Sequence, residues 1–285
     1  MKKSLLLLSV FLLTSCNISH EEENVIYTSF YPIYDFTKRI VGNHFDVVNL
    51  TPYGSEPHDY EPKAKEVVRM TTCKALFLNG LSLEPYQSTL PDEIQKKTYI
   101  VTKNIDYLYV DNVLDSHVWL SLDNAIAEMR NICDIVSDID PDNKDEYEKN
   151  YEYQRETFLS LKREYLEKFS SVSNRYLVVS HAAFGYLCKE FNLTQIYVSG
   201  LTPDDEPSPK ALENIIESVK EYHVSTIFYE ELVSNEISMK IAKETGVKVM
   251  TLNPLEGISK EDEGKEDYLS VMRKNYESIL EACKS

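Results

Sequence analysis

The sequence predicts an α/β fold with two lobes, each containing a four-stranded, mainly parallel sheet with flanking helices, joined by one long rigid helix. Three observations lead to this prediction. Short, continuously apolar runs occur in two sets of four, as expected for strands buried on both faces of a parallel sheet. Helical stretches alternate with these runs. A long, polar helical segment separates the two sets.

Each half of the chain contains four strand-like runs. Those of the first half are residues 25–30, 47–50, 75–78 and 99–101. Those of the second half are residues 176–179, 195–198, 226–229 and 247–252. Two helices between the later runs carry end signals. Ser208 and Pro209 form a cap and a first-turn proline, and a helix that begins near Ser234 stops at Gly246.

The segment between the halves predicts one helix over roughly residues 143–169, beginning after Pro141 and Asp142. Its apolar and aromatic positions are spaced by four and three: Tyr147, Tyr151, Gln154, Phe158, Leu161 and Tyr165. At the usual rise per residue this helix would be about 40 Å long. An ordinary surface helix or a coiled-coil segment would show a similar pattern, but its place between two α/β halves favours a stiff strut.

The N-terminus has the pattern of a secretory signal. Lys2 and Lys3 precede an apolar run at 5–13 that is too short to span a bilayer. Cys16 then follows small residues and resembles a bacterial lipobox, so we expect it to be lipidated and to anchor the protein to the membrane; a signal peptide that happens to contain a cysteine is the alternative. The expected organisation is a signal peptide at 1–15, a lipidated tether at 16–23, an N-terminal lobe at 24–140, a linking helix at 141–171 and a C-terminal lobe at 172–285.

Acidic residues dominate the composition. The chain has 47 Asp and Glu against 30 Lys and Arg, a formal net charge of −17. This excess argues against nucleic acid or anionic lipid as a partner. The four cysteines after Cys16 are not in CxxC pairs, and we interpret them as buried free thiols. Disulfides among them stay possible outside the cytoplasm, with a pairing that the sequence does not give: Cys73, Cys133, Cys188 and Cys283.

Four residues are the candidate metal ligands: His58, His117, His181 and Glu256. Three imidazoles and one carboxylate form a tetrahedral ligand set that suits Zn²⁺. Open α/β sheets bind ligands at the carboxyl ends of their strands. His181, Glu256 and His58 follow strand-like runs by two, four and eight residues, while His117 precedes Trp119 and a probable helix. Each half would supply two ligands, so the metal would bridge the lobes.

Each candidate is weak when taken alone, because a single histidine is more often solvated or hydrogen-bonded than a ligand. We interpret the other three histidines in that way: His20, His44 and His223. Glu256 alone would be a solvated loop acid, so the joint placement carries the hypothesis. Glu230 and Glu231 end a β-run, and either is a candidate acceptor that orients a ligand histidine, with a solvated acid as the alternative.

Seven stretches of the chain together resemble a known family. They lie at 28–36, 56–62, 79–85, 115–120, 179–186, 206–210 and 252–257. They resemble the solute-binding lipoproteins of zinc and manganese ABC transporters, the ZnuA/AdcA/TroA type. The resemblance implies two α/β lobes joined by a long helix. It also implies a monomeric, extracytoplasmic, lipid-anchored protein that delivers Zn²⁺ to an ABC permease and its ATPase.

The resemblance also bears on the metal. Many members have Asp where this chain has Asn253, but the streptococcal zinc branch resembles Asn-Pro-Leu-Glu, so we expect Glu256 to be the ligand. The manganese branch looks different, with a carboxylate at the position of His181, and imidazole favours Zn²⁺. The chain departs from the family pattern in two places. Ser116 stands where members often have proline, and the histidine-rich loop of many zinc importers is missing between Glu93 and Asp115.

Three other functions stay open at this point. The first is transport of Mn²⁺ or Fe²⁺ by the same fold. The second is a zinc-dependent hydrolase, although four protein ligands leave no open position on the metal and neither HExxH nor GxSxG is present. The third is surface adhesion, because the resemblance extends to family members regarded as adhesins.

Overall fold

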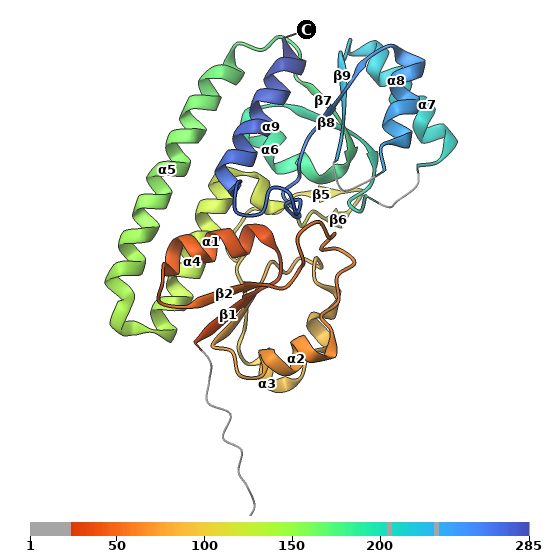
Figure 1. The fold of residues 1–285 in the computed structure, drawn as a ribbon. Helices are drawn as coiled ribbons and strands as arrows, with labels where there is room; N and C mark the ends of the chain where they lie inside the picture. Colours follow the sequence, from red (N-terminus) through yellow and green to blue (C-terminus); the bar gives the residue numbers. More distant parts are fainter. Residues whose placement is uncertain (1–23, 204–206, 231–233, 285) are drawn as a thin grey trace, which may run out of the picture.

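The computed structural model describes residues 24–203, 207–230 and 234–284. Figure 1 shows two α/β lobes, with the first half of the chain in the lower one and most of the second half in the upper one. The lower sheet contains β1 (Val25–Thr28), β2 (Asp46–Asn49), β3 (Ala75–Leu78) and β4 (Thr98–Ile100). The upper sheet contains β7 (Tyr176–His181), β8 (Thr194–Ser199), β9 (Thr226–Tyr229) and β10 (Lys248–Thr251). The predicted fold class is confirmed, whereas the predicted signal peptide and tether, with Cys16, lie outside the described residues.

The two sheets have the same topology. All their strand pairs are parallel. The strand orders are β2-β1-β3-β4 and β8-β7-β9-β10, so the chain changes direction between the first and third strand of each sheet. Such a switch point opens a crevice at the carboxyl ends of the strands. His181 differs slightly from the prediction, because β7 continues through it and makes it the last residue of the strand.

Helices cover the sheets on both sides. Those of the first half are α1 (Tyr31–Val41), α2 (Ala64–Met70), α3 (Asp92–Gln95) and α4 (Leu122–Ile139). Those after the linking helix are α6 (Gly185–Phe191), α7 (Pro209–Glu221), α8 (Glu236–Thr245) and α9 (Tyr268–Cys283). The described residues also include four 3₁₀ turns: η1 (Pro85–Thr89), η2 (Val118–Leu120), η3 (Pro141–Asn143) and η4 (Ala182–Phe184).

The predicted end signals act as expected. The Ser208 hydroxyl accepts the Ala211 N–H at the start of α7 (3.2 Å), and Gly246 ends α8 with a φ of 79°. Helix α9 was not predicted, and neither was the short hairpin of β5 (Tyr109–Val110) and β6 (Val113–Leu114). The hairpin turns at Asp111 and Asn112, both with positive φ, and two residues per strand are too few to give a periodic signal.

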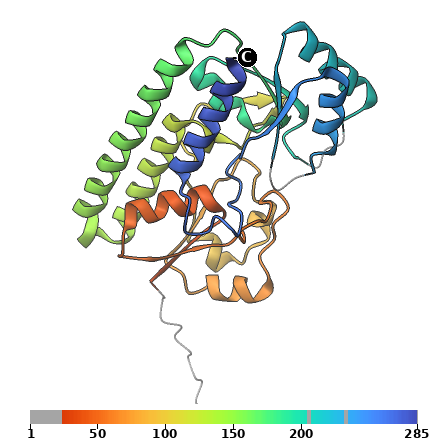
Figure 2. The ribbon, with the colours of Figure 1, turned by 45° about the horizontal axis from the view of Figure 1, so that its top comes forward.

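The predicted linking helix is α5 (Lys144–Ser170). It runs beside both lobes in the two ribbon views (Figures 1 and 2) and packs against α1, α4, α6 and α9. Its buried side chains include five of the six predicted positions and Phe169: Tyr147, Tyr151, Phe158, Leu161, Tyr165 and Phe169. The sixth, Gln154, instead accepts a hydrogen bond from Arg39 (3.1 Å). Because it touches elements of both halves, α5 fixes the lobes relative to each other.

One hydrophobic core runs through both lobes. It joins side chains of the first half, of α5 and of the second half. The ring of Phe158 on α5, for example, lies 6.1 Å from that of Phe36 and 5.4 Å from that of Tyr268. Two smaller clusters fill the outer faces of the two sheets. The predicted boundaries of the linking segment, after residues 140 and 171, remain a prediction. The four cysteines after Cys16 are buried, and none of them forms a disulfide with another described residue.

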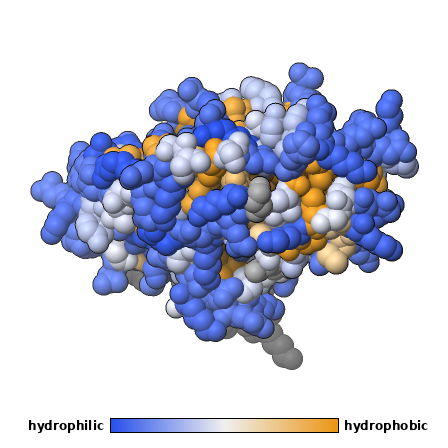
Figure 3. Space-filling view, turned by 90° about the horizontal axis from the view of Figure 1, so that it is seen from above, coloured by the Kyte–Doolittle hydropathy of each residue, from blue (hydrophilic) through white to orange (hydrophobic). Residues whose placement is uncertain are grey.

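The surface is polar, in keeping with the net charge of −17. In Figure 3, hydrophilic side chains cover most of the face seen from above, and apolar side chains are confined to smaller areas between them. Within the described part of the chain, no helix combines the length and the apolarity that crossing a bilayer requires.

A buried acid lies in the middle of α4. Glu128 is fully buried, and neither of its carboxyl oxygens has a hydrogen-bond partner among the described residues. Burial, together with the nearby Glu84, raises its pKa well above the usual value. Burial also raises the pKa of Glu84 to about 7. The folded protein therefore binds more protons at these two groups than the unfolded chain does above about pH 4.5.

We expect Glu128→Gln to reduce the loss of stability that occurs as the pH rises from about 5 to 8. Stability from a group whose folded pKa is raised is full below the unfolded pKa and decreases as the pH rises towards the folded one. Urea unfolding of the metal-free protein should show the variant gaining at least about 1 kcal/mol on wild type between pH 5 and pH 8. Asp138→Asn, an exposed acid on the same helix, is the control. Parallel pH profiles for wild type and Glu128→Gln would contradict the prediction.

Candidate metal centre between the lobes

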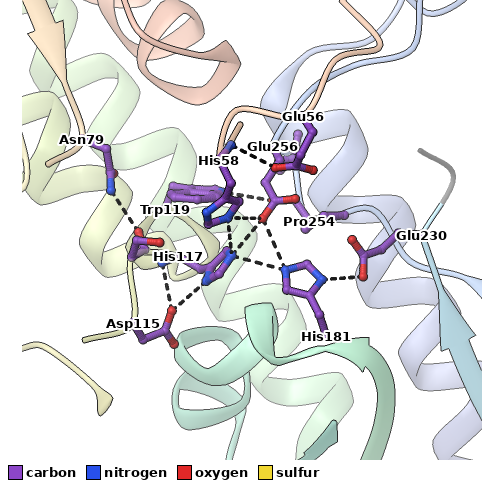
Figure 4. A network of polar contacts seen from close by, with 12 residues as sticks. Glu56, His58, Asn79, Asp115, His117, Trp119, His181, Glu230, Pro254 and Glu256 are labelled. Atoms are coloured by element: carbon purple, nitrogen blue, oxygen red, sulfur yellow. Dashed lines mark hydrogen bonds and ion pairs between the residues drawn. The ribbon is translucent and has the colours of Figure 1, made fainter. Parts of the chain in front are cut away.

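The four candidate ligands converge from four different segments (Figure 4). His58 lies in the loop between β2 and α2, and His117 lies directly before η2 and α4. His181 ends β7, and Glu256 lies in the loop between β10 and α9. The side chains of His117, His181 and Glu256 are almost completely buried, whereas the side chain of His58 is 12% exposed. His58 is therefore the candidate ligand nearest to solvent.

The atoms that meet are the three Nε2 nitrogens and one carboxylate oxygen. Glu256 Oε1 lies 2.8 Å from His117 Nε2, 3.3 Å from His58 Nε2 and 3.4 Å from His181 Nε2. His117 Nε2 lies 3.4 Å from His58 Nε2 and 3.3 Å from His181 Nε2. A tetrahedron whose corners are about 2.0–2.1 Å from a central Zn²⁺ has edges of about 3.3 Å. Four of these five separations match that edge, so these atoms lie close enough together to surround one Zn²⁺.

Two of the imidazoles are oriented by carboxylates behind them. Asp115 Oδ1 lies 2.8 Å from His117 Nδ1 and also accepts the His117 N–H (3.0 Å). Glu230 Oε1 lies 2.6 Å from His181 Nδ1 and accepts the Ser180 hydroxyl. An acceptor on Nδ1 leaves Nε2 free to bind a metal. Glu230 thus has the geometry of the predicted orienting acid, and Glu231 lies outside the described residues.

Asp115 was missed by the sequence reasoning as an orienting residue. The available signal was its place two residues before His117, where a carboxylate can reach back to both the backbone and the ring. An Asp side chain also bonds nearby backbone in ordinary Asx-turns, so this spacing alone does not assign the role.

Asn253 shapes the loop that carries Glu256, and its side chain is not among the metal-facing groups. The Asn253 side-chain oxygen accepts the Leu255 N–H (2.7 Å), and its backbone exchanges hydrogen bonds with Asn275 of α9 (3.0 and 2.6 Å). Leu255 has a φ of 60°, and this turn directs the next residue, Glu256, into the cluster. The structure therefore places Glu256, and not Asn253, among the imidazoles, as the sequence led us to expect.

The charged groups in the cluster shift one another's pKa values. Burial opposes the charge of His117, but the Asp115 and Glu256 carboxylates raise its pKa above the usual value. Burial likewise opposes the charge of His181, and Glu256 and Glu230 raise its pKa well above that value. Burial alone would raise the pKa of Glu256, but the surrounding imidazoles lower it well below the usual value.

Glu56 is a second carboxyl group beside the cluster, and it was also missed. Its side chain points towards Glu256 in Figure 4, and its Oε1 accepts the His58 N–H (3.2 Å). Burial and the neighbouring Glu256 raise the pKa of Glu56 to about 9. A lone Glu two residues before a histidine in a proline-rich loop gives no sequence signal for this placement.

The remaining histidines lie elsewhere. His44 Nε2 pairs with Glu146 on α5 (3.0 Å), and His223 follows α7 with a φ of 51°. His20 lies outside the described residues. Within the described ranges, both groups of His, Cys, Asp or Glu close enough to hold a metal share Glu256: one with His58 and His117, the other with His181 and Glu230. They are two sides of a single centre.

Two α/β lobes with a buried cluster of imidazoles and carboxylates at their junction have the architecture of a bilobal solute-binding protein. The family described as "Zinc-uptake complex component A periplasmic", ZnuA, matches residues 26–282. The chain belongs to this family. It is a family of solute-binding transport proteins and not of enzymes.

Individual relatives agree with this assignment. The zinc-binding protein AdcA of Streptococcus pyogenes serotype M1 is 32% identical over 98% of this chain and 61% of its own length. The high-affinity zinc uptake protein ZnuA of Bacillus subtilis (strain 168) is 32% identical over 90% of this chain and 86% of its own length. The chain thus spans about 61% of the length of the first AdcA relatives.

Solved structures show the same fold. The laminin-binding protein Lmb of Streptococcus agalactiae, described as a bifunctional adhesin and metal transporter, superposes with a TM-score of 0.86 at 34% identity, covering 91% of this chain and 99% of Lmb. The Zn(II)-bound ZnuA-like domain of Streptococcus pneumoniae AdcA gives a TM-score of 0.81 at 36% identity, covering 92% of this chain and all of that domain (100%).

Proposed function

We propose that this protein is an extracytoplasmic zinc-binding lipoprotein that captures Zn²⁺ between its lobes and delivers it to an ABC permease and its ATPase. The ligands are His58, His117, His181 and Glu256. The observation that carries the proposal is the convergence of three Nε2 atoms and one carboxylate oxygen, of which five pairs lie 2.8–3.4 Å apart. The zinc-binding names of the AdcA and ZnuA relatives support the choice of metal.

Transport rather than catalysis follows from the ligand count. Four protein ligands fill a tetrahedral zinc shell and leave no position for the water that a zinc hydrolase activates. The protein is a monomer anchored to the cell membrane through lipidated Cys16, an anchor supported by the lipoprotein name of the Streptococcus pneumoniae relative. Three imidazoles favour Zn²⁺ over the harder Mn²⁺, which prefers oxygen ligands.

Calorimetric titration of the metal-stripped protein with Zn²⁺, in the presence of excess Mn²⁺, tests this function. We expect one zinc per chain, bound tightly and unaffected by the competitor. Weak zinc binding, or displacement by Mn²⁺, would replace the zinc function by a manganese function. Esterase and peptidase activity of the zinc-loaded form would instead revive the hydrolase hypothesis.

The orienting carboxylates give a prediction of their own. We expect Glu230→Gln to weaken zinc binding by roughly 10- to 100-fold, because His181 loses the anion that fixes its ring and increases the basicity of Nε2. Competition with a chelator of known affinity measures the change. Glu236→Gln, an exposed acid six residues further on, should bind zinc as wild type does. Equal affinities for Glu230→Gln and wild type would remove Glu230 from the site.

A further inference from the structure

Helix α6 of the upper lobe contacts the segment of the lower lobe that carries His117. This segment runs from Asp115 to Asp123, and α6 follows His181 after the single turn η4. The two ligand histidines are therefore connected through α6 as well as through the metal centre. The contacts are made by three residues of the helix, one at each of its first two positions and one near its end.

The first contact lies before His117. Tyr186 is buried, and its hydroxyl accepts the Leu108 N–H (2.9 Å) and donates to the Asp115 carbonyl oxygen (3.0 Å). Leu108 and Asp115 also pair with each other, because the Asp115 N–H donates to the Leu108 oxygen (2.9 Å). A Cβ on Gly185 would lie 3.0 Å from Asp115 Oδ2, so a larger residue there would displace this carboxylate by a few tenths of an ångström.

The second contact lies after His117. The Glu190 side chain is only 3% exposed, and its two oxygens cap the first turn of α4 across the lobe junction. Oε2 accepts the Leu122 N–H (3.0 Å), and Oε1 accepts the Asp123 N–H and the Ser121 hydroxyl (both 3.1 Å). A carboxylate at this position satisfies N–H groups that a helix start leaves unpaired. Lys162 of α5 lies 3.3 Å from the same carboxylate.

Tyr186 and Glu190 are four residues apart, so they lie on one face of α6. Between them they hold both ends of the segment that contains His117. None of these bonds uses the imidazole of His117, whose Nε2 lies 3.3 Å from His181 Nε2. A binding site whose parts are already in place loses less conformational entropy when its ligand arrives.

We propose that Tyr186 and Glu190 are positioning residues that hold His117 at its binding distance from His181 before zinc arrives. The proposal rests on the proposed function, since it assigns these residues to the zinc site. It follows that this imidazole pair is a preformed half of the site. Breaking either contact releases one end of the His117 segment. Part of the free energy of zinc binding must then be used to order that segment.

Tyr186→Phe tests the proposal because it removes one hydroxyl and keeps the ring. We expect zinc affinity to fall by about tenfold or more, in the range found for other residues that orient metal ligands. The amide of Leu108 should exchange its hydrogen faster in the metal-free variant, and zinc should restore its protection. Glu190→Gln should do the same at Leu122. The visible absorption of the Co²⁺-loaded variants should also change as the ligand geometry loosens.

Tyr276→Phe is the matched control, because the Tyr276 hydroxyl is buried and has no hydrogen-bond partner among the residues that the structure describes. It should leave zinc affinity, amide exchange and the Co²⁺ spectrum unchanged. Faster exchange with wild-type zinc affinity would overturn the proposal, and so would weaker affinity with wild-type exchange. If wild type bound no zinc, the proposed function itself would be wrong. If wild type bound zinc and the variants had the same affinity and amide exchange, only the positioning role would be wrong. Should Tyr186→Phe not fold, Glu190→Gln carries the same readouts.

Discussion

Replacing Glu256 by alanine is expected to weaken zinc binding on the order of a hundredfold or more. Glu256 Oε1 is the atom that contacts all three Nε2 nitrogens, at 2.8, 3.3 and 3.4 Å. It is also the only carboxylate among the proposed ligands, in a buried place where removing one partner of a charge pair costs about 3–5 kcal/mol. That range corresponds to about two to four powers of ten in affinity. Calorimetric competition with a chelator measures the loss.

The control for this variant is Glu261→Ala, which removes an exposed acid from the same loop. It should bind zinc as wild type does, which separates the loss of a ligand from a change in net charge. If Glu256→Ala kept wild-type affinity, Glu256 would not be a ligand. Glu56, the second carboxyl group at the cluster, would then be the next residue to replace.

Zinc affinity is expected to fall steeply as the pH is lowered, from a higher pH than an ordinary histidine would give. Imidazoles bind a metal only when they are neutral, so protons compete with zinc. The carboxylates around His117 and His181 outweigh burial and raise the pKa of both rings above 6.5. Affinity should therefore be full only above these raised pKa values. With two such rings, it should fall by up to about a hundredfold for each pH unit below them.

The sign of this effect on stability is opposite in the metal-free protein. A histidine whose folded pKa is raised contributes stability that is full below about pH 6.5 and is lost as the pH rises through the folded pKa. The melting temperature of the metal-free protein should therefore lose this contribution at alkaline pH, while the increase caused by zinc grows. Scanning calorimetry with and without zinc at about pH 5.5, 7 and 8.5 checks both trends. A zinc-induced increase that is independent of pH would contradict the prediction.

Much of the fold could be predicted from the sequence, because buried parallel strands are continuously apolar. The eight predicted runs became the eight strands of the two sheets. Ser208, Pro209 and Gly246 set helix ends by purely local chemistry. The β5–β6 hairpin and α9 were missed: the hairpin strands are too short for periodicity, and the α9 segment was assigned to no element.

The candidate ligands could be chosen from the sequence, but their surroundings could not. His58, His117, His181 and Glu256 were chosen from the sequence, and the fold brings them together. Each half of the chain carries two of the candidate ligands, but the Glu256 loop is not held by its own half alone. The Glu256 loop belongs to the second half, yet it is bonded to the first through Trp119 Nε1 and the Pro254 oxygen (2.8 Å), and through the Gly54 N–H and the Ile258 oxygen (2.9 Å).

The sequence by itself determined which residues could be strands, helix ends and metal ligands, because those properties depend on near neighbours and on side-chain chemistry. Only the tertiary structure decided how the ligands are held. Asp115 and Glu230 orient two imidazoles, Glu56 lies against Glu256, and Tyr186 contacts the His117 segment. Most of these contacts join residues far apart in the chain, and no local pattern specifies which buried polar groups meet across two lobes.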